Sequence, residues 1–312
     1  MKAKRMMNKV LKRLLLAASM CCFVTTANAM PMDDATAAYI KGDYVQDFKL
    51  FSPLAAQGNT EAQNKIGVMY EYGKGVTQDY QEAVKWYMRA AAQGYSIAQY
   101  NIGWMYLNGQ GVAQNYQEAM KWYGLAAAQG HAPAQNNIGV LYEYGKGVTQ
   151  SYQEAVKWYR LAAAQGDARA QNSLGYMYLN GQGVAQSYQE AVKWYKLAAA
   201  QGVAEAQYNI GVLYANGQGA PQNYQEALKW YKLAAAQGVA EAQYNIGVVY
   251  EYGKGVTQDF ARAHMWYNLA SLAGDADGAK SRDLIAERMT PQQIGKAQDM
   301  ARECQERNFK GC

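Results

Sequence analysis

The chain has 312 residues, half of them hydrophobic, and a formal net charge of +5. Six of its 30 basic residues and none of its 25 acidic residues lie in residues 1–29, so the remainder carries a net charge of −1. A basic surface for nucleic acid is therefore not supported, and we expect no nucleic-acid partner.

Residues 1–29 have the pattern of a signal peptide. A basic start is followed by an apolar run at 14–24 and an Ala-Asn-Ala triplet, which predicts cleavage after Ala29. The apolar run is shorter than the roughly 20 residues of a membrane span. Cys21 and Cys22 raise the alternative of a lipid anchor, but the residues before them do not fit a lipobox. We expect a periplasmic or secreted protein that is not an integral membrane protein.

A spacing of 36 residues runs through most of the remaining chain. It is carried by two sets of residues: Gly58, Gly94, Gly130, Gly166, Gly202, Gly238 and Gly274, and Trp86, Trp122, Trp158, Trp194, Trp230 and Trp266. A fixed period of roughly 20–50 residues marks a repeat array. Each unit is too small to bury its own apolar face, so it must stack on its neighbours.

One unit, residues 60–94, reads as helix–turn–helix. An apolar stripe at helical spacing predicts a first helix, which ends at Gly73 because glycine favours the left-handed cap conformation. Asp79 is a good N-cap for a second helix, and Glu82 stands where a capping-box partner belongs. The second helix carries Trp86 on its inner face. We expect an all-α fold with two helices of about 13 residues in each unit.

Glycine also recurs in the middle of the first helix, at Gly67, Gly103, Gly139, Gly175, Gly211 and Gly247. Glycine costs about 1 kcal/mol relative to alanine in a helix interior. A cost that is repeated in every unit implies a reason, and we expect the close approach of a neighbouring helix or of the bulky tryptophan.

The two ends of the array depart from the template, as end units should. We assign residues 1–29 to a signal peptide, 30–57 to an N-terminal capping helix region, 58–273 to six repeats and 274–312 to C-terminal capping helices. Cys304 and Cys312 can close a small disulfide loop in an oxidising compartment. Cys304 also continues an apolar helical stripe as a small buried residue, and the two interpretations are compatible.

The repeated motif resembles the Sel-1-like repeat (SLR), a relative of the tetratricopeptide repeat. In this chain it stands as Glu61-Ala62-Gln63, Ile66-Gly67, Tyr70, Gly73-Lys74-Gly75-Val76, Tyr80-Gln81-Glu82-Ala83, Lys85-Trp86-Tyr87 and Ala90-Ala91-Ala92-Gln93-Gly94. The resemblance implies a right-handed α/α superhelical solenoid and a role in protein–protein interaction, in signalling, envelope biology or host contact. A secreted branch of the family looks like penicillin-binding or weak β-lactamase proteins, but it carries cysteine pairs in each repeat, which this chain lacks.

The sequence offers no pattern typical of an active site. No Ser-x-x-Lys occurs, and the only histidines, His131 and His264, lie in different units and registers. Gly73-Lys74-Gly75 lacks the Walker spacing and reads as a turn. We therefore expect no enzyme, no cofactor and no metal.

One stripe on the first helices, at the positions of residues 64, 68 and 71, lies roughly opposite the core. Part of it must pack on the adjacent unit, and the rest can line the concave face, where solenoids commonly bind. Our candidate protein-binding residues on it are Tyr100, Trp104, Leu107, Tyr176, Leu179, Tyr208 and Tyr244, because aromatic residues dominate binding hot spots.

The preferred hypothesis is a non-enzymatic scaffold for an unidentified protein partner. The alternative is a peptidoglycan-binding accessory or a β-lactamase-like penicillin-binding repeat protein, with cell-wall components as the ligand.

Overall fold

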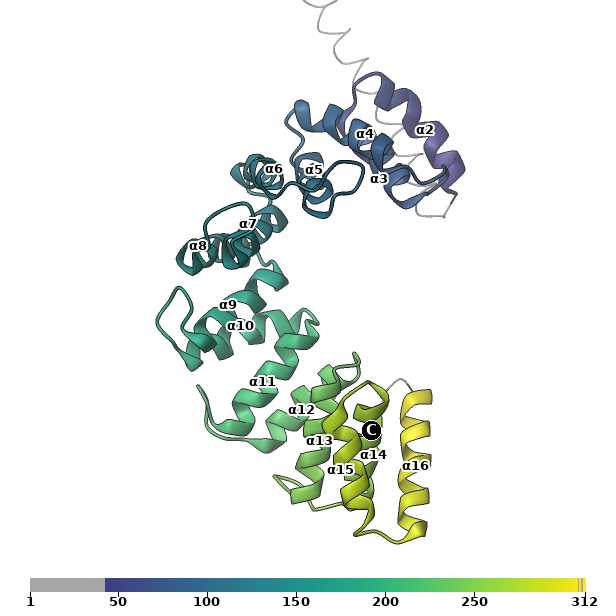
Figure 1. The fold of residues 1–312 in the computed structure, drawn as a ribbon, viewed down its shortest axis with the longest axis vertical. Coiled ribbons are helices and arrows are strands. Elements are labelled where there is room, and N and C mark those ends of the chain that lie inside the picture. Colours follow the sequence, from purple (N-terminus) through teal and green to yellow (C-terminus); the bar gives the residue numbers. More distant parts are fainter. Residues whose placement is uncertain (1–42, 308, 310) are drawn as a thin grey trace, which may run out of the picture. The chain divides into compact units, whose positions relative to one another are not determined.

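A computed structural model describes residues 43–307, 309 and 311–312, and the expected signal peptide lies outside these residues. The described chain contains fifteen helices and no strand, arranged as a solenoid of helix–turn–helix repeats (Figure 1). The fold class predicted from the period is thus confirmed. None of the described helices is both long enough and apolar enough to cross a membrane.

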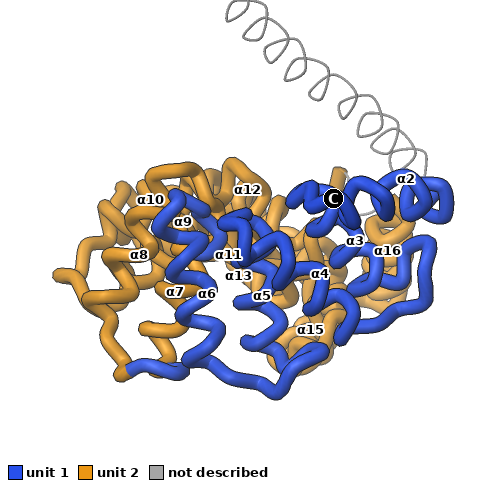
Figure 2. The backbone as a smooth tube through the Cα atoms, turned by 90° about the horizontal axis from the view of Figure 1, so that it is seen from above, with its two compact units in different colours: residues 1–134, 146–148 blue, residues 135–145, 149–312 orange. Residues whose placement is uncertain are grey.

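The chain divides into two compact units, coloured separately in Figure 2: residues up to 134 with 146–148, and residues 135–145 with 149–312. The helices of the first unit are α2 (Tyr44–Ala56), α3 (Thr60–Tyr72), α4 (Tyr80–Ala92), α5 (Ser96–Asn108) and α6 (Tyr116–Ala128), and most of α7 (Ala132–Tyr144) belongs to the second. The second unit continues with α8 (Tyr152–Ala164), α9 (Ala168–Asn180), α10 (Tyr188–Ala200), α11 (Ala204–Asn216), α12 (Tyr224–Ala235), α13 (Ala240–Tyr252), α14 (Phe260–Leu272), α15 (Ala276–Ala286) and α16 (Pro291–Glu306).

The N-caps of the second helices confirm half of the expected capping box. The Asp79 side chain accepts hydrogen bonds from the backbone N–H groups of Gln81 and Glu82. The backbone N–H of Asp79, however, donates to the Tyr70 carbonyl at 2.9 Å. It therefore does not need the Glu82 side chain as an acceptor. The Glu82 carboxylate instead pairs with Lys85 at 2.5 Å. In the described residues, both halves of the box occur in α16, at Thr290 and Gln293.

The mid-helix glycines make room for a tyrosine of the neighbouring second helix, which is one of the two expected reasons, whereas the other, the tryptophan, was wrong. A Cβ atom on Gly67 would lie 2.6 Å from the ring of Tyr87, which is fully buried. The same contact recurs between Gly175 and Tyr195. Trp86, one residue before Tyr87, is only partly buried. The tyrosine ring therefore occupies the space that a side chain at the glycine position would need.

The second glycine of each Gly-x-Gly turn joins successive repeats. At Gly183, φ is +70°, and a Cβ atom there would overlap the backbone carbonyl of Tyr152, the first residue of α8. The turn therefore lies directly on the backbone of the preceding repeat, which supports its structural interpretation.

Glutamines tie the end of the second helix to the first helix in the repeats before α14. In the second unit, Gln201 Nε2 donates to Gln171 Oε1 at 2.8 Å, and Gln171 Nε2 donates to the Ala163 carbonyl at 3.3 Å. Gln171 is buried, so these bonds satisfy a polar side chain inside the stack. The glutamines at the positions of Gln63 and Gln93 are thus accounted for by packing.

Helix α2, the first of the described helices, buries a carboxylate. Asp47 is fully buried, and neither of its oxygens has a hydrogen-bond partner among the described residues. Burial raises the pKa of Asp47 from 3.8 to about 6, although the Lys65 ammonium opposes the shift. A buried carboxylate of this kind disfavours folding when it is charged.

We expect the stability of this end to depend on the protonation of Asp47. The folded pKa lies above the unfolded value, so the folded state binds the proton more tightly, and stability should fall as the pH rises from about 4 to 6. Asp47→Asn should remove this dependence and stabilise the protein at pH 7 by on the order of 1 kcal/mol. Thermal unfolding between pH 4 and 7 measures both effects. Asp277→Asn, at an exposed position of α15, is the control, and an unchanged pH profile in Asp47→Asn would contradict the assignment.

The C-terminal end is closed by α14, α15 and α16. A disulfide joins Cys304 and Cys312, whose Cα atoms are 5.8 Å apart, and the Lys232 ammonium donates to the Cys312 carbonyl at 3.1 Å. Cys304 is also buried, in line with its place on an apolar helical stripe. The ring of Phe309 stacks on Trp266 at 6.3 Å. These contacts cover the last repeat, whose Trp266 is buried.

Candidate functional site

Three of the candidate stripe residues are packing residues. Tyr100 of α5 lies with its ring centroid 5.6 Å from Tyr123 and 5.0 Å from His131. Tyr208 and Tyr244 contact Tyr231 and Tyr267 in the same way, at 6.0 and 5.5 Å. All three are partly buried. Where a tyrosine occupies the position of residue 64, it therefore packs the first helix against the buried tyrosine of the second helix.

The two leucines of the stripe are also partly buried. Leu179 packs against the core cluster that contains Tyr195, and Leu107 occupies the equivalent position in α5. Trp104 and Tyr176, by contrast, are 39% and 42% exposed. The stripe thus divides by register, and the position of residue 68 offers the exposed aromatic surface. Whether these residues bind a protein stays a prediction.

Around Tyr176 the second unit contains a hollow of about 430 Å³. Three first helices and one second helix, labelled in Figure 1, supply its walls. They contribute Val140, Glu143 and Tyr144 from α7, Tyr159 from α8, Asn172, Ser173 and Tyr176 from α9, and Glu205 from α11. We refer to this feature as the α7–α9–α11 groove. It brings together residues that are up to 65 positions apart in the sequence only because successive repeats place their first helices next to one another.

Hydrogen bonds hold the two carboxylates of the groove. The Tyr159 hydroxyl donates to Glu143 Oε2 at 2.5 Å, and the Asn172 amide donates to Glu205 Oε2 at 3.0 Å. Asn172 Oδ1 is buried and has no partner among the described residues. The carboxylates are therefore oriented by neutral donors, and one buried amide oxygen is left without a hydrogen bond.

The groove is lined by acidic and aromatic side chains. Neither Glu143 nor Glu205 forms a salt bridge with a lysine or arginine in the part of the chain that the structure describes. The Glu143 carboxylate, with burial and hydrogen bonding, raises the pKa of Tyr144, whose side chain is 62% exposed. Burial, followed by Glu143, raises the pKa of Tyr159 well above its usual range. Both phenols therefore remain neutral donors at physiological pH.

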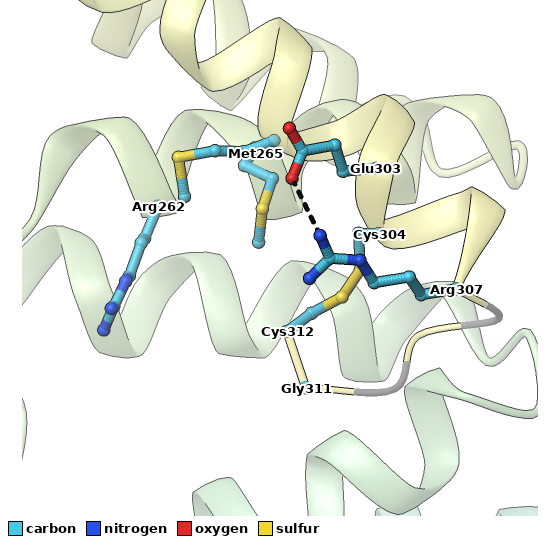
Figure 3. Close-up of a pocket in the computed structure, with 8 residues that line it drawn as sticks. Arg262, Met265, Glu303, Cys304, Arg307, Gly311 and Cys312 are labelled. Atoms are coloured by element: carbon cyan, nitrogen blue, oxygen red, sulfur yellow. Dashed lines mark hydrogen bonds and ion pairs between the residues drawn. A yellow bond between two sulfur atoms is a disulfide. The ribbon is translucent and has the colours of Figure 1, made fainter.

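A smaller hollow of about 140 Å³ lies beside the disulfide (Figure 3). Its lining includes Arg307, which pairs with Glu303 at 3.4 Å. The sulfur atoms of Cys304 and Cys312 are bonded to each other, so this hollow offers no free thiol. No group of three or more histidine, cysteine, aspartate or glutamate side chains in the described residues could hold a metal ion.

Sequence reasoning missed Tyr144 and Glu205, and it placed Glu143 on the stripe, at the position of residue 71, without choosing it as a candidate. A signal for them was present. Glu143 does not occupy the N-cap register, and its position alternates among glutamate, leucine and alanine along the array. A charged residue that repeats out of the capping register needs another explanation, which the bond from Tyr159 supplies.

Comparisons with known proteins agree with this architecture. A family model described as Sel1 repeat matches six consecutive segments: 60–95, 96–131, 132–167, 168–203, 204–239 and 240–275. The structure of a Sel1 repeat protein from Oxalobacter formigenes is 36% identical, with a TM-score of 0.69, and the match covers 77% of this chain and 96% of that one. A protective antigen of uropathogenic Escherichia coli strains, with an SLR fold, is 28% identical with a TM-score of 0.56, covering 88% and 68% of the two chains. No curated protein matched the chain.

Proposed function

Because the chain belongs to the Sel1 repeat family, we propose that it is a periplasmic or secreted scaffold that binds a protein partner through the first helices of its repeats. Proteins of this family are generally scaffolds for protein–protein interaction and are typically not enzymes. The signal-like segment 1–29 supports the extracytoplasmic setting. The Escherichia coli relative is a protective antigen, which is in keeping with that setting.

The observation that carries the proposal is the exposed aromatic register on the first helices. Trp104 and Tyr176 are bulky residues that each expose about two fifths of their surface, although smaller valines occupy the equivalent places in the other repeats. Large, partly exposed aromatics are the side chains that most often dominate protein interfaces. The α7–α9–α11 groove adds hydrogen-bonding and charged groups beside one of them.

A capture experiment tests this proposal. The processed protein is the bait in envelope extract of the source organism, and the recovered proteins and glycans are identified by mass spectrometry. The double variant Trp104→Ala/Tyr176→Ala should reduce capture of a specific protein at least about tenfold, because hot-spot aromatics each contribute more than about 1 kcal/mol. Circular dichroism checks that helicity is unchanged.

The matched control is Leu125→Ala/Leu161→Ala, which removes two side chains of similar exposure from the second helices α6 and α8. It should capture the partner like the unmodified protein. Equal capture by both double variants would remove the first helices from the binding surface. Recovery of muropeptides without a specific protein would favour the cell-wall alternative and make an activity assay the next step.

A further inference from the structure

The pair formed by Glu143 and Tyr159 has a copy in the last repeat, and that copy shows what the carboxylate can hold. There the Tyr267 hydroxyl donates to Glu251 Oε2 at 2.6 Å. The guanidinium of Arg288 lies 3.7 Å from the other oxygen, Glu251 Oε1, and rests 4.3 Å above the ring of Phe260. One oxygen thus takes the phenol, and the second faces a guanidinium that an aromatic ring supports.

Arg288 comes from the segment that follows α15, outside the matched repeats. The connection between α15 and α16 therefore places a basic side chain next to the carboxylate of the last repeat. A carboxylate that already accepts one hydrogen bond still has lone pairs for a second donor, and arginine suits such a site because its planar fork carries five N–H groups.

At Glu143 the tyrosine bond is the same, but no basic side chain of the described chain pairs with the carboxylate. The next two first helices instead add an aromatic ring, Tyr176, a buried amide oxygen on Asn172, and a second carboxylate, Glu205. These are a cation–π surface, a hydrogen-bond acceptor and a further negative charge. The groups that complement a guanidinium are present, and residues 43–307 do not supply the cation.

We propose that the α7–α9–α11 groove is a socket for an arginine side chain of the partner protein. The inference rests on the proposed scaffold function and gives it a chemical specificity. Glu143 and Glu205 receive the guanidinium N–H groups, and Tyr144 and Tyr176 cover the guanidinium faces. A calcium ion fits less well, because it needs six to eight oxygen ligands.

The array contains one such socket among its matched repeats. The first Glu–Tyr pair, Glu71 with Tyr87, has Tyr100 where the groove has Asn172, and Pro133 where the groove has Glu205. It therefore lacks the amide oxygen and the second carboxylate. The copy at Glu251 is already paired with Arg288. A single arginine site within the matched repeats follows.

The test uses three synthetic peptides and the full processed protein. Each peptide is acetyl-Gly-Gly-Xaa-Gly-Gly-amide, with arginine, its neutral isostere citrulline, or lysine at the central position. NMR titration follows the tyrosine ring signals, assigned with Tyr144→Phe and Tyr176→Leu. The arginine peptide should bind saturably with one-to-one stoichiometry, at least about tenfold more tightly than the citrulline peptide and several-fold more tightly than the lysine peptide. Binding should weaken with salt.

Matched variants assign the binding to the groove. Glu143→Gln and Glu205→Gln should each weaken arginine binding about tenfold. Glutamine at 143 keeps an oxygen that can accept from the Tyr159 hydroxyl, so the fold should be retained. Glu154→Gln, on α8 and paired with Lys157 at the surface, is the control and should bind like the unmodified protein. Tyr176→Leu gives a second readout that leaves both carboxylates in place, and it should also lose affinity.

The socket is refuted if the citrulline peptide binds as tightly as the arginine peptide, or if Glu143→Gln and Glu205→Gln bind without loss. Lysine binding as tight as arginine binding would overturn the choice of ligand. The two proposals fail separately. A partner captured equally by Glu143→Gln and the unmodified protein would leave the scaffold intact and exclude the socket. Binding of the arginine peptide without capture of any partner protein would support the socket and contradict the scaffold function.

Discussion

Alanine at Gly103 is expected to destabilise the protein by about 1–3 kcal/mol, whereas alanine at Gly124 should stabilise it by up to about 1 kcal/mol. Both glycines lie inside helices of the same repeat, Gly103 in α5 and Gly124 in α6. Helix propensity alone favours alanine at both sites. The difference in sign must therefore come from what surrounds each position.

A Cβ atom on Gly103 would lie 2.6 Å from two ring carbons of Tyr123, which has no exposed surface. The ring cannot turn aside without disturbing the close-packed core. A Cβ atom on Gly124 would meet no atom within 4 Å. Urea unfolding of the two variants and the unmodified protein gives the comparison as a shift in midpoint. Stabilisation by Gly103→Ala would show that the ring has room to move, and the glycine would then need another explanation.

The architecture was predictable from the sequence because each repeat carries the same signals for helices and turns. The period, the N-caps and the glycine turns occur in every unit, so a local ambiguity in one unit is resolved by the others. Where prediction failed, the reason was a contact between two helices that the sequence pattern does not specify. Glu82 does not complete its capping box, because the Tyr70 carbonyl from the preceding helix takes the N–H of Asp79 first. The glycines face tyrosine because only the packed pair of helices determines which ring of Trp86-Tyr87 points inward.

The candidate site was predictable only in part. Helical spacing places Tyr176 and Tyr208 on one stripe of the first helices. It does not tell how much of the face the neighbouring helix covers, so Tyr208, which packs on Tyr231, could not be distinguished from the exposed Tyr176. Glu205 could not be found at all from its own repeat, since it acts together with residues of α7 and α9. Convergence across repeats is a property of the stack.

The buried tyrosines provide a test of how the array tolerates polar groups in its core. Tyr159 donates its hydroxyl hydrogen to Glu143, but Tyr195, one repeat later, faces Leu179 at that position, and its buried hydroxyl has no partner in the described chain. Tyr159→Phe should cost about 1.5–3 kcal/mol, because a hydrogen bond to a charged group is lost and the carboxylate loses its donor. Tyr195→Phe should be neutral or stabilising, because it removes an unsatisfied hydroxyl.

Urea unfolding of both phenylalanine variants measures this contrast. The chain itself suggests the compensating change, since leucine replaces glutamate where the hydroxyl has no partner. Glu143→Leu added to Tyr159→Phe should restore most of the lost stability, because replacing both partners of a buried hydrogen bond with apolar groups is nearly neutral. The double-mutant cycle then gives the coupling between Tyr159 and Glu143 directly. Equal destabilisation by Tyr159→Phe and Tyr195→Phe, with no recovery in the double variant, would mean that the bond contributes little. A strong coupling would mean that the tyrosine hydroxyl stabilises the partly buried carboxylate in the repeats that carry glutamate at this position. The hydrogen bond would then also hold the carboxylate in a fixed position for binding a cation.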